Sequence, residues 1–152
     1  MTDADLAAHL ADTAGRLLLE VRASGLFSAK ALGKAGDQTA NQFLVHALRE
    51  QRAEDGLLSE EMACDGARLQ HSRVWIVDPV DGTREYGEAR TDWAVHVGLA
   101  IDGVASIGGR EVAGVGLAHM NPVTAKLRGK VGPVVEDHGH PARPGDGPEH
   151  LH

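Results

Sequence analysis

The hydrophobic positions at the start of the chain recur at the spacing of one helical face. They are Leu6, Leu10, Leu17, Leu18 and Val21. Thr2 and Asp5 resemble a capping box, so we expect a helix that opens there and runs to about Arg22. A loop is expected over residues 24–35, which contain two glycines. A second amphipathic helix is expected to begin near Asp37.

Shorter apolar runs further along the chain predict β-strands. Leu57 to Glu60 is one such run, and Arg73 to Val77, rich in β-branched and aromatic residues, is another. Residues 93–100 alternate between large apolar residues and small or polar ones, which indicates a half-buried strand. His96 lies on the other side of that alternation, so a structural role is expected for it. A further strand is expected over residues 112–119.

The second of these runs ends in acidic residues. Asp78 and Asp81 flank Pro79, and Gly82 and Thr83 follow directly. Proline disfavours the helical region for the residue before it, so the two carboxylates can converge instead of alternating across a strand. Carboxylate oxygens are the ligands that Mg²⁺ prefers, and exposed amides after them can donate to a phosphate. The string therefore favours a metal-phosphate site over the alternative, a tight acidic surface turn that binds nothing.

Three segments together resemble the inositol monophosphatase superfamily of Mg²⁺-dependent phosphomonoesterases. The family motif Asp-Pro-(Ile/Leu/Val)-Asp-Gly-Thr is complete at residues 78–83, after the strand Trp-Ile-Val. Residues 57–61 resemble the family strand that ends in Glu-Glu, and residues 36–41 resemble the segment whose Asp positions the catalytic water. The resemblance covers residues 3–103 well and residues 111–131 loosely.

The resemblance implies an α+β fold: the N-terminal half of the layered α-β-α-β-α sugar-phosphatase fold, with two long helices packed on a mostly antiparallel sheet. It also implies a role for each residue of the motifs. Glu60 and Asp78, with the backbone carbonyl of Val80, would bind one Mg²⁺, and Asp78 and Asp81 would share in binding a second. Asp37 and Thr83 would orient the attacking water, and the amides of Gly82 and Thr83 would hold the phosphate.

The residues after the motif indicate a branch of the family. Arg84-Glu85-Tyr86 and the segment 92–96 resemble the 3′(2′),5′-bisphosphate nucleotidases, which convert 3′-phosphoadenosine 5′-phosphate to AMP and phosphate. An inositol-1-monophosphatase-like phosphatase acting on a sugar phosphate is the first alternative. A non-catalytic metal- or nucleotide-binding remnant is the second, and a subunit that needs a complementary half in trans is the third.

Composition narrows the class of partner and the compartment. The chain has 152 residues and a formal net charge of −7, which argues against nucleic-acid binding. Its one cysteine, Cys64, excludes an internal disulfide, is consistent with a reducing cytoplasm, and is expected to be a spectator. The acidic N-terminus and the lack of a long apolar run predict neither a signal peptide nor a membrane span.

The character of the chain changes after residue 131. Four of the six prolines fall within residues 132–152, a Gly/Pro/His-rich segment expected to be a disordered tail with solvated histidines, whereas residues 1–131 are expected to form the metal-binding half-domain. The Trp-Asp-x-Ala-Ala motif that supplies a further metal ligand in the family does not occur. We therefore expect a truncated enzyme with impaired activity, and possible self-association through an exposed face of its sheet.

Overall fold

The computed structural model describes residues 1–59 and 71–112, with side chains described as far as residue 107. Two long helices come first, and a sheet with one short helix between its strands follows. The elements are α1 (Asp3–Ala23), α2 (Ala29–Gln51), β1 (Gly56–Ser59), β2 (Arg73–Asp81), α3 (Thr83–Gly87), β3 (Ala94–Ile101) and β4 (Val104–Val112). Residues 60–70, which include Glu60 and Cys64, and residues 113–152 lie outside the described part.

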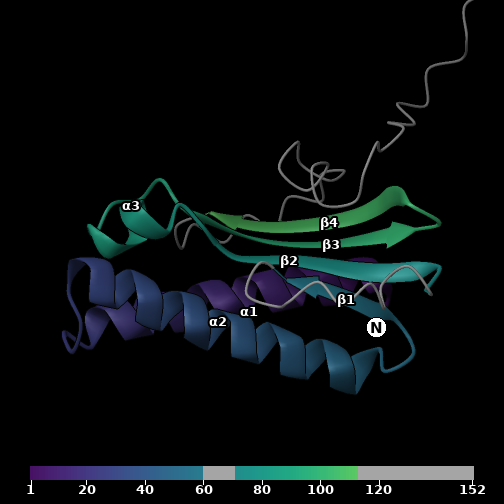
Figure 1. Cartoon of the computed structure of the whole chain (residues 1–152), viewed down its shortest axis with the longest axis horizontal. Coiled ribbons are helices and arrows are strands. Elements are labelled where there is room, and N and C mark those ends of the chain that lie inside the picture. Colours follow the sequence, from purple (N-terminus) through teal and green to yellow (C-terminus); the bar gives the residue numbers. More distant parts are fainter. Residues whose placement is uncertain (60–70, 113–152) are drawn as a thin grey trace, which may run out of the picture.

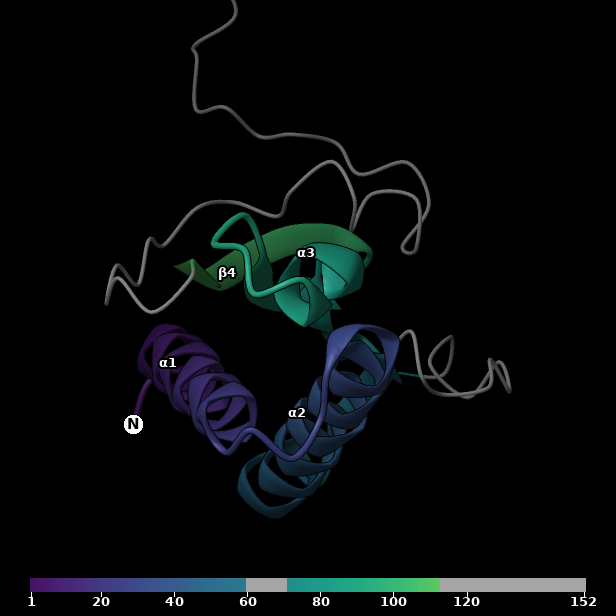
Figure 2. The same cartoon turned by 90° about the vertical axis from the view of Figure 1, so that its left-hand side faces the viewer.

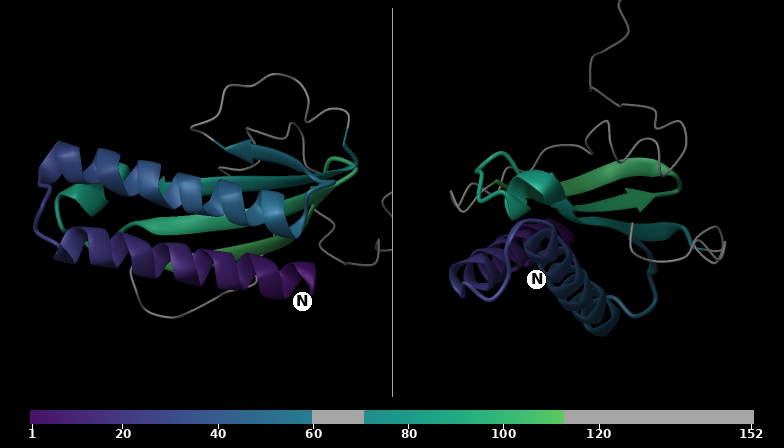
Figure 3. Two further views of the ribbon diagram at one scale, coloured as in Figure 1. Left: turned by 90° about the horizontal axis from the view of Figure 1, so that it is seen from below. Right: turned by 60° about the vertical axis from the view of Figure 1, so that its left-hand side comes forward.

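The four strands form one sheet in the order β1-β2-β3-β4. β1 runs parallel to β2, and the two remaining pairs are antiparallel. Both long helices lie on the same face of this sheet, side by side along the strands (Figures 1 and 3), and Figure 2 shows them end-on beneath it. The expected fold class, two long helices on a mostly antiparallel sheet, is confirmed.

The core lies between the helices and the helix-facing side of the sheet. Apolar residues of both helices meet alternate residues of β2 and β3 there, and all of them are nearly inaccessible. They include Leu6, Leu10, Leu18, Leu44, Leu48, Trp75, Val77, Val95, Val97 and Leu99. Because each such side chain contributes about 1.5–3 kcal/mol on burial, this layer is the main source of the fold's stability.

The first helix begins where the sequence predicts. The hydroxyl of Thr2 accepts a hydrogen bond from the amide of Asp5 at 3.1 Å and donates one to its carboxylate at 2.7 Å. The second helix begins at Ala29, eight residues earlier than expected. Gly33 suggested a loop, but it lies inside α2, where it and Gly36 allow Thr83 and Tyr86 to pack against the helix backbone.

The strands after the acidic motif differ in two ways from the expectation. β3 is buried along almost its whole length, so the prediction of a half-buried strand is wrong. β4 ends at Val112, where a strand was expected to begin, and residues 113–119 lie outside the described residues. The missed signal is Asp102-Gly103, whose φ angles of +52° and +78° form the tight turn between β3 and β4.

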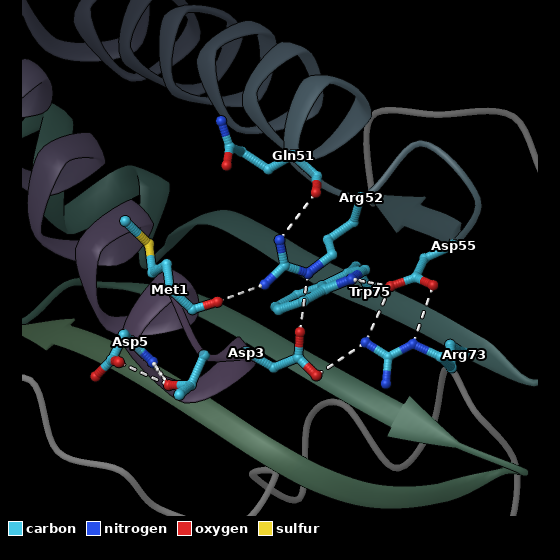
Figure 4. Close-up of polar contacts among 9 residues, drawn as sticks. Met1, Asp3, Asp5, Gln51, Arg52, Asp55, Arg73 and Trp75 are labelled. Atoms are coloured by element: carbon cyan, nitrogen blue, oxygen red, sulfur yellow. Dashed lines mark hydrogen bonds and ion pairs between the residues drawn. The ribbon is translucent and has the colours of Figure 1, made fainter.

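A network of charged residues joins the helices to the sheet at the end remote from the acidic motif (Figure 4). Asp3 accepts hydrogen bonds from Arg52 and Arg73, each at 2.9 Å. Asp55 accepts from Arg73 at 3.0 Å and from the indole of Trp75 at 2.9 Å. Burial alone would raise the pKa of Asp3, but the two guanidinium groups lower it below its usual value. The same contacts raise the pKa of Arg73.

The face of the sheet that points away from the helices carries a small second cluster. Ile76 and Ala100 are its buried members, at 0% and 2% exposure, and Leu58, Val74 and Ala105 pack against them. The expectation of an open apolar face is therefore not met at Ile76 and Ala100. Self-association through the sheet stays a prediction, as does the domain boundary at residue 131, which lies outside the described residues.

Candidate functional site

An irregularity at the end of β2 brings the two motif carboxylates to one face of the sheet. Asp78 pairs with His96 of β3, and Asp81 pairs with Ala94, so three steps along β2 match two steps along β3. In a regular strand, residues three apart point to opposite faces. Here the extra residue in the segment Pro79-Val80 turns Asp81 to the same face as Asp78, because their partners at positions 94 and 96 of β3 share a face. Convergence of the two carboxylates thus has a backbone cause.

The two carboxylates differ in exposure. Asp78 is 1% exposed, whereas the side chain of Asp81 is 40% exposed. Val80, between them, turns into the helix-side core and is 3% exposed. A buried carboxylate beside a half-exposed one, at the end of a strand, is an arrangement in which a cation would reach both groups from the solvent side.

A left-handed residue directly follows the acidic pair. Gly82 has φ +90° and ψ +48° and precedes α3. A side chain at this position would be strained, and its Cβ would also lie 3.0 Å from the carbonyl oxygen of Asp92. The hydroxyl of Thr83 donates to the carbonyl of Val80 at 3.2 Å. The chain therefore turns sharply enough to leave the Gly82 and Thr83 amides at the helix start, where backbone N–H groups have no partner within a helix.

One face of α2 runs past this turn. Gly33, Asp37 and Asn41 are one helical turn apart and so share a face. A Cβ on Gly33 would lie 3.0 Å from the Cγ2 methyl of Thr83, and Asn41 Oδ1 accepts a hydrogen bond from the Ser59 hydroxyl at 2.5 Å. Asp37 therefore lies on the stretch of α2 that begins beside Thr83 and ends beside the last residue of β1. Glu60, the next residue of the chain, lies outside the described part.

His96 lies beside the acidic pair, a contact that the sequence reasoning did not predict. It is 5% exposed, and its Nε2 lies 3.1 Å from Oδ2 of Asp81. It does point away from the helix-facing apolar layer, as expected, but that direction leads to the carboxylate pair. Its position in the alternation was the available signal. His96 is paired with Asp78, so both residues face the same side of the sheet.

The short helix α3 is held against both long helices by its aromatic residue. The hydroxyl of Tyr86 donates to the carbonyl of Leu18 at 2.6 Å, and its ring meets the ring of Trp93 edge-on, with centroids 5.2 Å apart. The guanidinium of Arg22 lies 5.6 Å and 5.7 Å from the centroids of these two rings. These contacts fix the helix whose first residue is Thr83.

The donor set suits a hard divalent cation. Asp78, Asp81 and the carbonyl of Val80 supply only oxygen atoms, as Mg²⁺ requires. Within residues 1–59 and 71–112 no group of three or more His, Cys, Asp or Glu side chains gathers as a metal site. The two carboxylates would thus form a partial oxygen-ligand set, of the kind Mg²⁺ completes with waters and substrate phosphate.

The fold and the residues at the end of β2 define a class of protein. It is an α+β protein in which an acidic strand end lies beside a glycine turn and the start of a helix. Residues 5–109 match the inositol monophosphatase family, and the chain belongs to that family. It is 52% identical over 123 residues to the 3′-phosphoadenosine 5′-phosphate phosphatase of Mycobacterium leprae, a match that covers 78% of this chain and 45% of the relative. It is 33% identical over 102 residues to human inositol monophosphatase 2, covering 62% of this chain and 35% of that protein.

A solved structure agrees with the fold. The crystal structure of CysQ from Bacteroides thetaiotaomicron superimposes with a TM-score of 0.61 at 26% identity and covers 71% of this chain and 41% of that one. The chain thus spans less than half the length of these relatives. In the part of the chain that the structure describes, no helix combines the length and the apolar character needed to cross a membrane.

Proposed function

We propose that this chain carries the metal- and phosphate-binding half of a Mg²⁺-dependent phosphomonoesterase of the 3′(2′),5′-bisphosphate nucleotidase type. The observation that carries the proposal is the bulge in β2, which turns Asp78 and Asp81 to one face directly before the Gly82-Thr83 turn. The substrate, 3′-phosphoadenosine 5′-phosphate, follows from the name of the Mycobacterium leprae relative.

In this proposal each residue has an assigned task. Asp78, Asp81 and the Val80 carbonyl would hold Mg²⁺, together with Glu60. When bound, the cation would neutralise phosphate charge and lower the pKa of a nearby water. The Gly82 and Thr83 amides would donate to phosphate oxygens and keep the phosphorus atom in place.

Asp37 and Thr83 would orient the attacking water. The carboxylate of Asp37 would accept a hydrogen bond from that water and take part in removing its proton. The Thr83 hydroxyl already donates to the Val80 carbonyl, so its oxygen lone pairs face away from that bond and can accept from a water. Water oxygen would then attack phosphorus while the bond between phosphorus and the 3′ oxygen breaks. The 3′ oxygen takes up a proton from water, which leaves AMP and inorganic phosphate.

Phosphate release from 3′-phosphoadenosine 5′-phosphate by the full chain tests this proposal. With Mg²⁺ present, Asp78→Asn is expected to lower turnover by a factor on the order of 100, because it removes the buried charge that faces the cation. A chelator should act in the same direction. Asp102→Asn is the matched control: Asp102 lies exposed in the β3–β4 turn, and Asn tolerates its positive φ.

The outcomes separate the candidates. Unchanged turnover in Asp78→Asn would refute the assignment of Asp78 as a metal ligand. Faster release from inositol 1-phosphate than from the nucleotide would favour the inositol monophosphatase-like function suggested by the human relative. Mg²⁺ binding without turnover would support a binding protein, or a subunit that needs a complementary half. If the chain neither binds Mg²⁺ nor releases phosphate, the proposal is refuted.

A further inference from the structure

His96 combines deep burial with a contact to a half-exposed carboxylate. Its side chain is 6% exposed and that of Asp81 is 40% exposed, and the ring Nε2 lies 3.1 Å from Oδ2. β3, which carries His96, is hydrogen-bonded on one side to β2 and on the other to β4. Its place in a strand paired on both sides therefore makes the histidine a rigid partner for the half-exposed carboxylate.

The chemistry of the two groups defines the hydrogen bond. An ionised carboxylate only accepts hydrogen bonds, so the Nε2 atom of His96 must carry the hydrogen that joins it to Asp81. Ordering a half-exposed Asp side chain costs free energy when a ligand binds. A donor in a fixed place removes most of that cost in advance.

Packing alone does not explain a histidine at this position. Further along the same face of the sheet lie the apolar Ile76 and Ala100, which are buried. Burying an imidazole costs free energy that burying an aliphatic side chain of similar size would not. The residue is better explained by what it does to Asp81.

We propose that His96 is a positioning residue, whose Nε2–H group holds Oδ2 of Asp81 and thereby fixes the orientation of that carboxylate towards a divalent cation. The proposal rests on the proposed function, since it takes Asp81 to be a cation ligand. Hydrogen bonds to a ligating group commonly change metal affinity by about 10–100-fold. His96 itself touches neither substrate nor reacting atoms.

Mn²⁺ binding to the full chain, followed by the electron paramagnetic resonance signal of free Mn²⁺, tests the proposal without measuring activity. His96→Leu keeps a buried side chain but removes the donor, and it should weaken Mn²⁺ binding about 10-fold. His96→Gln retains an N–H donor and should restore most of the affinity. His46→Leu, at an exposed histidine on α2, is the matched control and should change nothing.

The outcomes distinguish failure of the positioning role of His96 from failure of the proposed function. If Asp81→Asn weakens binding but His96→Leu does not, the positioning role is overturned and the proposed function stands. If Asp81→Asn leaves Mn²⁺ binding intact, Asp81 is not a ligand and both fail. Equal losses in His96→Leu and His96→Gln would indicate a packing effect and count against positioning.

A measurement on the unaltered chain decides the matter if the leucine variant does not fold. Long-range ¹H–¹⁵N correlation spectra report which ring nitrogen of His96 carries the hydrogen. The proposal requires a slowly exchanging hydrogen on Nε2. A neutral ring protonated only on Nδ1 would overturn it.

Discussion

Gly36 of α2 is the position where adding one methyl group should have the clearest effect on stability. A Cβ built there would overlap Cε1 of Tyr86 and would lie 2.9 Å from Cζ of that ring and 3.0 Å from Cδ2 of Leu18. The ring cannot easily move aside, because its hydroxyl is bonded to the Leu18 carbonyl and Trp93 meets it edge-on.

Two opposing terms set the size of the effect of Gly36→Ala. Replacing a glycine in a helix interior by alanine stabilises the helix by about 1 kcal/mol. Overpacking in a tight core costs about 1–3 kcal/mol, and loss of the Tyr86 hydrogen bond would add about 1 kcal/mol. The packing cost therefore exceeds the gain in helix propensity, and we expect the variant to be less stable by about 1–3 kcal/mol.

Urea unfolding followed by tryptophan fluorescence measures the change, since Trp93 lies beside the displaced ring. Gln38 is exposed on the same helix, so the pair Gln38→Gly and Gln38→Ala supplies the helix-propensity term free of packing. In a Tyr86→Leu background, Gly36→Ala should become neutral or stabilising. A Gly36→Ala variant at least as stable as the parent chain would refute the reasoning.

Two further predictions concern pH. The pKa of Asp3 is lowered from 3.8 by Arg73 and Arg52 against the effect of burial, so its ion pairs stabilise the fold above that value and cease to do so as the pH falls through the lowered pKa. Asp3→Asn should thus cost about 1 kcal/mol at neutral pH and nothing in strong acid, measured by urea unfolding, and a cost independent of pH would contradict this. Tyr86 is the chain's one tyrosine, and burial raises its pKa above 10.0 although Arg22 acts in the opposite direction. An alkaline absorbance titration of Tyr86 should give a midpoint above 10.0, and the midpoint should rise further in Arg22→Gln. The fold should lose stability as the pH rises beyond 10.0, because the unfolded chain then releases the tyrosine proton first. A midpoint at or below 10.0 would contradict the burial argument.

The elements that the sequence predicted best are those in which local signals agree with packing. Thr2 and the leucine spacing both predicted α1, and the β-branched run at residues 73–77 predicted the first part of β2. α2 begins earlier than predicted because Gly33, which suggested a loop, has a tertiary reason to be glycine. That reason is the close approach of α3, which no local propensity contains.

The same limit applies to the site. The order Asp78-Pro79-Val80-Asp81 suggested that two carboxylates converge. The match of three steps along β2 to two steps along β3, however, depends on pairing with a strand that comes later in the chain. His96 could be assigned to a face from its alternation, yet which side chains share that face depends on the same register. One inserted residue in β2 therefore brings both Asp81 and His96 into the site.

The bulge also links the site to the core. Val80 lies within the bulge and is 3% exposed in the helix-side cluster, so a residue of the insertion that shifts Asp81 is itself held by packing in the core. An insertion held this way resists being straightened, because straightening β2 would pull Val80 out of the core at a cost of about 1.5–3 kcal/mol. The alignment of the two carboxylates is thus stabilised by burial of the residue between them, and needs no bound ligand to maintain it.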